Sequence, residues 1–152
     1  MPIVSEVTLS VSIPSDNDGY VTFQCPFCDG RFKLTAKDFE RKDLIYLFCP
    51  YCGLQEEGNQ FLSDEVIEQI QIVAANYLKT MVNQFQKDLK RSFKKSKFLS
   101  FKAGKKLKED PENTLFESEE MDLSHCLYCD FGVKVQPIAH EIGICCPYCG
   151  VR

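Results

Sequence analysis

The sequence contains no long hydrophobic run. Its longest apolar stretch, residues 44–49, is far shorter than the roughly 20 residues that span a bilayer, and no signal-peptide pattern precedes the cysteines. There is also no glycine-rich phosphate loop, no serine–histidine–aspartate arrangement and no pair of carboxylates marked out by its context. We therefore expect a soluble, cytoplasmic protein that has no membrane partner and is not an enzyme.

Cysteine, by contrast, is abundant, with nine residues in a chain of 152. Eight of them form four C-x2-C pairs, in which a tight turn can point both sulfurs at one metal. Zinc prefers four such ligands in a tetrahedron, so two pairs complete one structural site. Twenty residues separate the first two pairs and sixteen the last two, spacings that suit a ribbon folded over its metal. The sequence predicts two Zn²⁺ ions, one bound by Cys25, Cys28, Cys49 and Cys52 and the other by Cys126, Cys129, Cys146 and Cys149.

Other uses of the cysteines are less well supported by their surroundings. Disulfides are rare in the reducing cytosol. A redox dithiol of the Cys-Pro-Tyr-Cys type needs a helix directly behind it, but Gly53 and a polar stretch follow the first copy. An alternative stays open, in which a metal is bound by C-x2-C pairs from different halves of the chain or from different subunits. We expect Cys145 to be a packed thiol, and His125 and His140 to be surface residues or to support the ligands rather than bind metal.

The Cys-Pro-aromatic-Cys-Gly pairs resemble the knuckles of the zinc-ribbon group of folds. In that group the glycine after the second cysteine takes a positive φ. Gly53 and Gly150 match this pattern, while Asp29 and Asp130 replace the glycine upstream; aspartate tolerates positive φ better than most residues. The resemblance covers about 20–54 and 124–152 and implies a fold and a metal. It implies no single function, because ribbons occur in transcription factors, polymerase subunits, ribosomal proteins and adaptors.

Alternating apolar residues predict short strands around these sites. We expect strands at 3–13, 20–24, 32–34, 44–48, 133–135 and 142–144, and a helical turn from Thr35 to Lys42. The expected fold class is small α+β, with two four-cysteine zinc ribbons of short antiparallel strands joined by one long amphipathic helix. The predicted organisation is a strand hairpin with the first ribbon at 1–60, the helix at 61–100, a charged linker at 101–123 and the second ribbon at 124–152.

The long helix begins after Ser63, a natural N-cap, with two acids in its first turn. Apolar residues recur every three or four positions from Val66 to Phe93, with no glycine or proline before Gly104. A helix running to about residue 95 is roughly 45–50 Å long. Its apolar stripe must be covered by the ribbons, by a second copy or by another protein. A homodimer or a protein partner bound through 64–95 is therefore one expectation.

Charge is distributed unevenly. Residues 87–108, here called the basic tract, hold ten of the eighteen Lys and Arg and one acid, whereas residues 109–122, the acidic segment, hold seven acids and no base. One hypothesis is a nucleic-acid-associated adaptor, in which lysines contact phosphates and phenylalanines stack on bases. The alternative is a protein–protein adaptor that binds no nucleic acid, whose ribbons and helix dock a partner or a second copy and whose basic tract pairs with the acidic segment or keeps the helix end soluble. A further hypothesis is that the acidic segment folds onto the basic tract and competes with polyanions. The candidate nucleic-acid-binding residues are Lys87, Lys90, Arg91, Lys94, Lys95, Lys97, Phe98, Phe101, Lys102, Lys105, Lys106 and Lys108.

Overall fold

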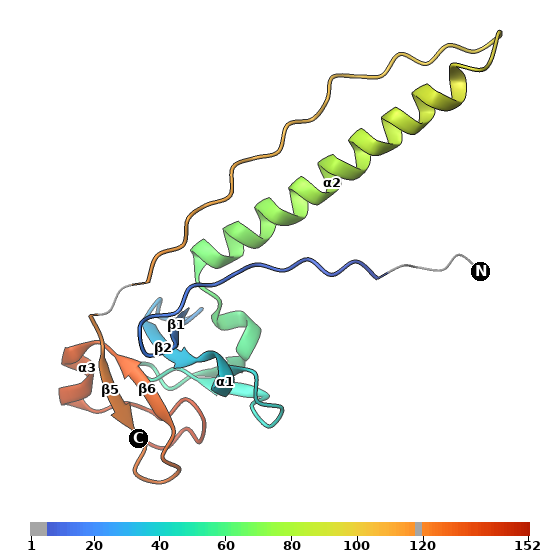
Figure 1. The fold of residues 1–152 in the computed structure, drawn as a ribbon. Coiled ribbons are helices and arrows are strands. Elements are labelled where there is room, and N and C mark those ends of the chain that lie inside the picture. Colours follow the sequence, from blue (N-terminus) through green and yellow to red (C-terminus); the bar gives the residue numbers. More distant parts are fainter. Residues whose placement is uncertain (1–5, 118–119) are drawn as a thin grey trace. The chain divides into compact units, whose positions relative to one another are not determined.

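The computed structural model describes residues 6–117 and 120–152, and the chain divides into two compact units (Figure 1). The cysteine unit comprises Ser12–Ile67 with Leu115–Arg152, and the helical unit comprises Glu68–Thr114 with the described residues up to Val11. Both cysteine-rich segments, which the sequence suggested would be separate modules, therefore belong to one unit. Its elements are β1 (Tyr20–Gln24), β2 (Arg31–Thr35), α1 (Ala36–Phe39), β3 (Tyr46–Phe48), β4 (Gln55–Glu57), the 3-10 turn η1 (Gly58–Phe61), the start of α2 (Asp64–Phe93), β5 (Asp122–His125), β6 (Gly132–Val135) and α3 (Pro137–Ile142).

One antiparallel sheet joins the two halves of the cysteine unit. Its strand order is β1-β2-β6-β5, so that strands from the first half, β1 and β2, pair with strands from the second. The junction is the pairing of β2 with β6, where Lys33 lies opposite Lys134. A second, two-stranded sheet pairs β3 with β4. The sequence predicted the small α+β class and the antiparallel strands correctly.

The two halves are copies of one pattern. Cys25, Cys28 and Lys33 each have a counterpart 101 positions later, and both halves end in the same Cys-Pro-Tyr-Cys-Gly. Because β2 and β6 are the equivalent strands of the two copies, their antiparallel pairing relates the halves by a local two-fold axis. The arrangement resembles a small symmetric dimer built within one chain.

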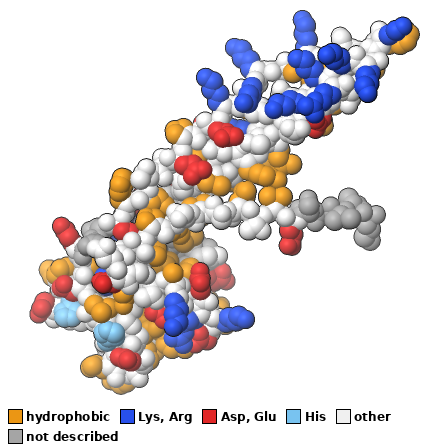
Figure 2. All heavy atoms as spheres, in the orientation of Figure 1, with side chains coloured by type: hydrophobic (Ala, Val, Ile, Leu, Met, Phe, Trp, Pro, Cys, Tyr) orange, Lys and Arg blue, Asp and Glu red, His pale blue; other side chains and the backbone are white. Residues whose placement is uncertain are grey.

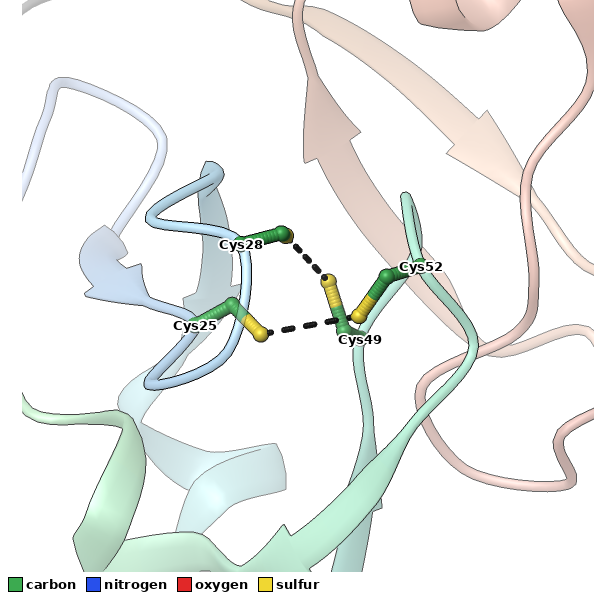
Figure 3. Close-up of side chains that lie close together, drawn as sticks. All are labelled: Cys25, Cys28, Cys49 and Cys52. Atoms are coloured by element: carbon green, nitrogen blue, oxygen red, sulfur yellow. Dashed lines mark hydrogen bonds between the residues drawn. The ribbon is translucent and has the colours of Figure 1, made fainter.

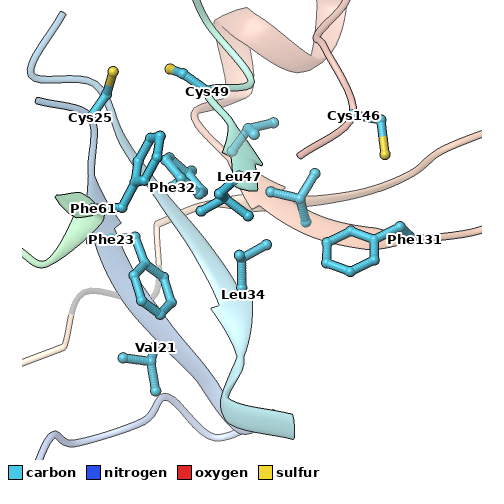
Figure 4. Close-up of a cluster of buried hydrophobic side chains, with 12 residues drawn as sticks. Val21, Phe23, Cys25, Phe32, Leu34, Leu47, Cys49, Phe61, Phe131 and Cys146 are labelled. Carbon is cyan, nitrogen blue, oxygen red and sulfur yellow. The ribbon is translucent and has the colours of Figure 1, made fainter. Parts of the chain in front are cut away.

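The core of the cysteine unit lies between the sheet and the cysteine loops (Figure 4). Phe32, Leu34 and Val135 are completely buried on adjacent strands, and Leu47 and Phe61 reach them from β3 and η1. The core therefore draws residues from both halves. Neither half would bury these side chains alone, because modules of 30–50 residues have too little apolar surface.

Three of the local predictions need correction. No strand forms at 6–13, where Val7 and Leu9 are exposed; the start of that predicted strand, 3–5, lies outside the described residues. The outer side of β1 is instead taken in part by a bridge from Phe23 to Leu62. The turn after Thr35 ends at Phe39, well before Lys42, although Thr35 does cap it by accepting a hydrogen bond from the Asp38 N–H.

The predicted strand at 142–144 is also wrong. Helix α3 occupies Pro137–Ile142, with proline in its first turn, where the missing N–H costs nothing. Strand β6 lies between β2 and β5, so both of its edges are already paired and a return strand would have no partner there. Strand β5 takes that place and begins at Asp122, inside the segment expected to be linker.

Helix α2 agrees closely with the prediction. It spans Asp64–Phe93, starts directly after Ser63 and carries Asp64 and Glu65 in its first turn. At 1.5 Å per residue its thirty residues extend about 45 Å. Among the described residues, no helix combines the length and the apolar character needed to cross a membrane.

Candidate metal centres

The first centre brings together four cysteine sulfurs from two loops (Figure 3). Strand β1 ends just before Cys25, and strand β3 ends just before Cys49, so each strand delivers one knuckle. The Sγ atoms of Cys25 and Cys52 are 3.7 Å apart, and those of Cys28 and Cys49 are 3.6 Å apart. All four sulfurs lie within 4.8 Å of one another.

The second centre repeats this geometry. Strand β5 ends just before Cys126, and Cys146 opens the last knuckle of the chain. The Cys126 and Cys149 sulfurs are 3.6 Å apart, and those of Cys129 and Cys146 are 3.5 Å apart. The structure therefore groups the cysteines within each half, in the two predicted sets of four.

The knuckle turns explain why these residues hold the sulfurs together. Asp29, Gly53, Asp130 and Gly150 all have positive φ, of 57°, 74°, 57° and 71°. Each donates its backbone N–H to the carbonyl of the first cysteine of its knuckle, at 2.9–3.0 Å. Aspartate thus takes the glycine conformation in the upstream knuckles, as the sequence predicted.

Both sites fit a tetrahedral metal ion. With metal–sulfur bonds of about 2.3 Å, a regular tetrahedron places its sulfurs about 3.8 Å apart, close to the observed separations of 3.5–3.7 Å. The N–H groups of Phe27 and Tyr51 point at the Cys25 and Cys49 sulfurs, at 3.4 Å each. Such hydrogen bonds orient a ligand and stabilise negative charge on it.

The electrostatics of the thiols show what a cation would contribute. Burial raises the pKa of Cys49 and of Cys146 far above the ordinary thiol range. At Cys126 burial also raises the pKa, but hydrogen bonds from the Cys129 and Tyr128 backbone and from neighbouring thiols outweigh it and lower the pKa to about 7. A metal ligand must be a thiolate. The charge of a bound cation therefore offsets the cost of ionising the buried cysteines.

The two centres are tied together by reciprocal hydrogen bonds. The residue before each C-terminal knuckle donates its N–H to the proline carbonyl of the other knuckle: Phe48 to Pro147, and Cys145 to Pro50, both at 2.9 Å. The Tyr51 hydroxyl donates to the Arg31 carbonyl and accepts the Gln136 N–H. Neither contact could be read from the sequence, although the identical knuckles were a signal that the halves are related.

The cysteine and the histidines outside the two sets lie close to the centres without joining them. Cys145 is buried, and its sulfur packs against Gly53. A Cβ atom added to Gly53 would lie only 3.1 Å from the Cys145 Sγ. His125 is half-exposed, 3.7 Å from the Asp130 carboxylate, and His140 lies on α3. None of the three belongs to either four-sulfur group.

A buried ionic cluster lies at the β2–β6 junction, and no sequence pattern predicted it. The Lys134 ammonium lies 2.8 Å from Asp16 and 2.6 Å from Asp18, and Lys33 lies 3.5 Å from Asp16 and 3.3 Å from Glu117. Like charges directly opposite on paired strands repel each other. The carboxylates neutralise the two lysines and link residues from both ends of the unit. Although burial alone would raise it, the pKa of Asp16 is lowered, because Lys134 and two backbone N–H groups donate to the carboxylate.

The basic tract lies on the last turns of α2 and the irregular segment after it (Figure 2). In the described part of the chain, its only recorded ion pair joins Arg91 to Asp88, at 3.9 Å. Phe98 is 96% exposed, as a stacking residue would be. Phe101, however, stacks on Phe93 with ring centres 6.1 Å apart, so one face of this predicted base-stacking ring is already engaged.

Among the described residues, the recorded contacts of Glu109, Asp110 and Glu117 lie outside the basic tract, unlike the hypothesised fold-back. Glu109 and Asp110 instead pair with Thr80 and Lys79 in the middle of α2. Glu117 joins the buried cluster of the cysteine unit, Glu119 lies outside the described residues, and Asp122 begins β5. The lysines of the tract are therefore left facing solvent.

Comparison with known proteins gives no relative: no protein-family model, no curated protein and no solved structure matches this chain.

Proposed function

We propose that this is a non-enzymatic, cytoplasmic zinc protein that contacts nucleic acid through its basic tract. The four-thiolate sets favour zinc, and a zinc ion with four protein ligands has no open position to activate water. Its role is structural: metal binding and folding share one free energy in such sites. The cysteine unit then serves as a scaffold that carries the helical unit.

The observation that carries the nucleic-acid proposal is the excess of positive charge in residues 87–108. Ten basic residues share the segment with one acid, Asp88, and Asp88 lies 3.9 Å from Arg91, both of them exposed. Only one of the ten is arginine, the side chain that reads guanine best. The proposed contacts are therefore with phosphates and independent of sequence, and the exposed ring of Phe98 can stack on an unpaired base.

Salt dependence tests this proposal. Six to ten phosphate contacts lose about 10³–10⁵ in affinity between 50 and 200 mM salt. We expect fluorescence anisotropy with mixed single- and double-stranded oligonucleotides to show this loss. The double substitution Lys94→Gln with Lys95→Gln should make the affinity less dependent on salt concentration. The matched control is Lys37→Gln with Lys42→Gln, which removes the same charge from the cysteine unit. Salt-independent binding, or equal effects of the two variants, would contradict the proposal.

The second candidate is a protein–protein adaptor that uses the apolar side of α2. Large apolar side chains along the helix are exposed: Leu78 by 61%, Met81 by 51% and Phe85 by 63%. Contiguous exposed apolar surface marks interaction sites, and a second copy or another helix would cover it. Analytical ultracentrifugation of the wild type and of Leu78→Glu with Phe85→Glu tests self-association. A wild-type monomer at all concentrations would exclude the second copy.

A further inference from the structure

A row of side-chain amides runs along one face of α2 within the helical unit. Gln69, Asn76 and Asn83 are spaced seven residues apart, which places them on one side of the helix about 10.5 Å from each other. This polar face is covered: Gln69 is only 4% exposed. We call these three residues the amide row.

The amide row binds the backbone of residues 107–113. Asn83 donates to the Leu107 carbonyl at 2.8 Å and accepts the Leu107 N–H at 2.9 Å. Asn76 holds Asp110 in the same way, at 2.9 and 2.8 Å. Gln69 accepts the N–H of Asn113 at 2.8 Å. Each asparagine therefore satisfies both backbone groups of one residue.

The repeat of the row matches the repeat of an extended chain. The bound residues, Leu107, Asp110 and Asn113, are three apart, and three extended residues span about 10 Å. The seven-residue helical step is about 10.5 Å. The contacts involve groups that every residue except proline possesses, so the row recognises an extended backbone rather than a particular sequence.

Neighbouring side chains add a preference for acidic residues. Lys79 lies 2.6 Å from the Asp110 carboxylate, the Thr80 hydroxyl donates to Glu109 at 3.0 Å, and the Gln69 amide donates to Glu112 at 3.1 Å. Main-chain hydrogen bonds with side-chain selection are the usual basis of extended-peptide recognition.

The segment 107–113 is held weakly enough to be exchanged. It has no regular secondary structure, and its one large apolar residue, Leu107, is 41% exposed. Its attachment therefore consists of one exposed ion pair and of hydrogen bonds that are exposed except for the two part-buried ones at Gln69, each of small net effect. Tethering on the same chain keeps it in place through a high effective concentration.

We propose that the amide row is a docking site for an extended acidic peptide of a partner protein, and that residues 107–113 occupy this site in the free chain. The partner segment replaces 107–113 and presents its backbone to Asn76 and Asn83 and its acids to Lys79, Thr80 and Gln69. This inference does not depend on nucleic-acid binding.

A labelled synthetic peptide with the sequence of residues 105–115 tests the site in the whole 152-residue chain, prepared with zinc. Leu107→Pro with Asp110→Pro removes two of the three backbone N–H groups that the resident segment donates to the row, and leaves the sequence of α2 unchanged. We expect the peptide to bind this variant at least about tenfold more tightly than it binds the wild type. Adding Asn76→Leu and Asn83→Leu should abolish binding, whereas the control Gln71→Leu, on an exposed position outside the row, should not.

The resident segment gives a second measurement. Trypsin cleaves after Lys106 and Lys108, and the amide row should protect both bonds. We expect cleavage to be several-fold faster in Asn76→Leu with Asn83→Leu than in Gln71→Leu, with helix content by circular dichroism unchanged. No peptide binding by the proline variant, binding that survives loss of both asparagines, or equal cleavage rates would overturn the proposal.

Discussion

The buried ionic cluster of the cysteine unit makes a quantitative prediction about Asp16. This carboxylate is 1% exposed and lies between Lys33 and Lys134, whose side chains are 0% and 9% exposed. It also accepts the backbone N–H groups of Asp18 and Tyr20. The substitution Asp16→Asn keeps an oxygen for these N–H groups but removes the negative charge.

We expect Asp16→Asn to lower the free energy of unfolding by about 3–5 kcal/mol, the cost of removing one partner from a buried ion pair. Lys134 then keeps only the exposed Asp18, and Lys33 keeps only Glu117, at 3.3 Å. With an m-value of about 2 kcal/mol/M in urea, the unfolding midpoint should fall by roughly 1.5–2.5 M. Urea titration followed by circular dichroism, at one fixed free zinc concentration, measures this shift.

Asp18→Asn is the matched control. Asp18 lies 2.6 Å from the same Lys134 ammonium, but its side chain is 70% exposed, and exposed pairs contribute only about 0–1 kcal/mol. Adding Lys134→Met to Asp16→Asn should recover part of the loss, because removing both members of a buried pair costs less than removing one. Equal effects of Asp16→Asn and Asp18→Asn would refute the reasoning, since burial would then not determine the cost.

The shared sheet and the knuckle turns lead to two further predictions. Cys49→Ser should abolish zinc binding at the first centre and weaken it at the second, because β2 and β6 pair. Competition with a chromogenic chelator measures the zinc affinity of both sites. An unchanged affinity at the second site would show that the halves fold independently. Gly150→Ala should lower the free energy of unfolding by about 1–2 kcal/mol or more, because φ is 71° there and a Cβ would meet the Phe48 ring at 2.9 Å. Gly104→Ala, whose Cβ would make only an ordinary 3.7 Å contact, is the control in thermal unfolding.

The local features of this protein were predictable because short-range chemistry determines them. The C-x2-C spacing specifies the sulfur groups, and the residues after each second cysteine specify the positive φ at Asp29 and Asp130. Helix α2 was predictable from its apolar periodicity and from the acids after Ser63. In each case the determining residues form a local sequence pattern, either a short spacing or a repeat along one helix.

The features that the sequence did not indicate all depend on contacts between distant segments. Lys33 and Lys134 look like ordinary strand lysines until β2 and β6 pair. The alternation at 3–13 predicted a strand, but the described part of that segment, residues 6–13, joins neither sheet. Asn76 and Asn83 look like solvent-facing helix residues, and their hydrogen bonds to the backbone form only because residues 107–110 lie beside them.

The most direct test of the two metal centres is native mass spectrometry of the 152-residue chain. We expect two zinc ions per chain, with the eight clustered cysteines resistant to alkylation until zinc is chelated. Fewer than two zinc ions, or clustered cysteines that react freely in the metal-loaded protein, would contradict the assignment of two four-cysteine zinc sites.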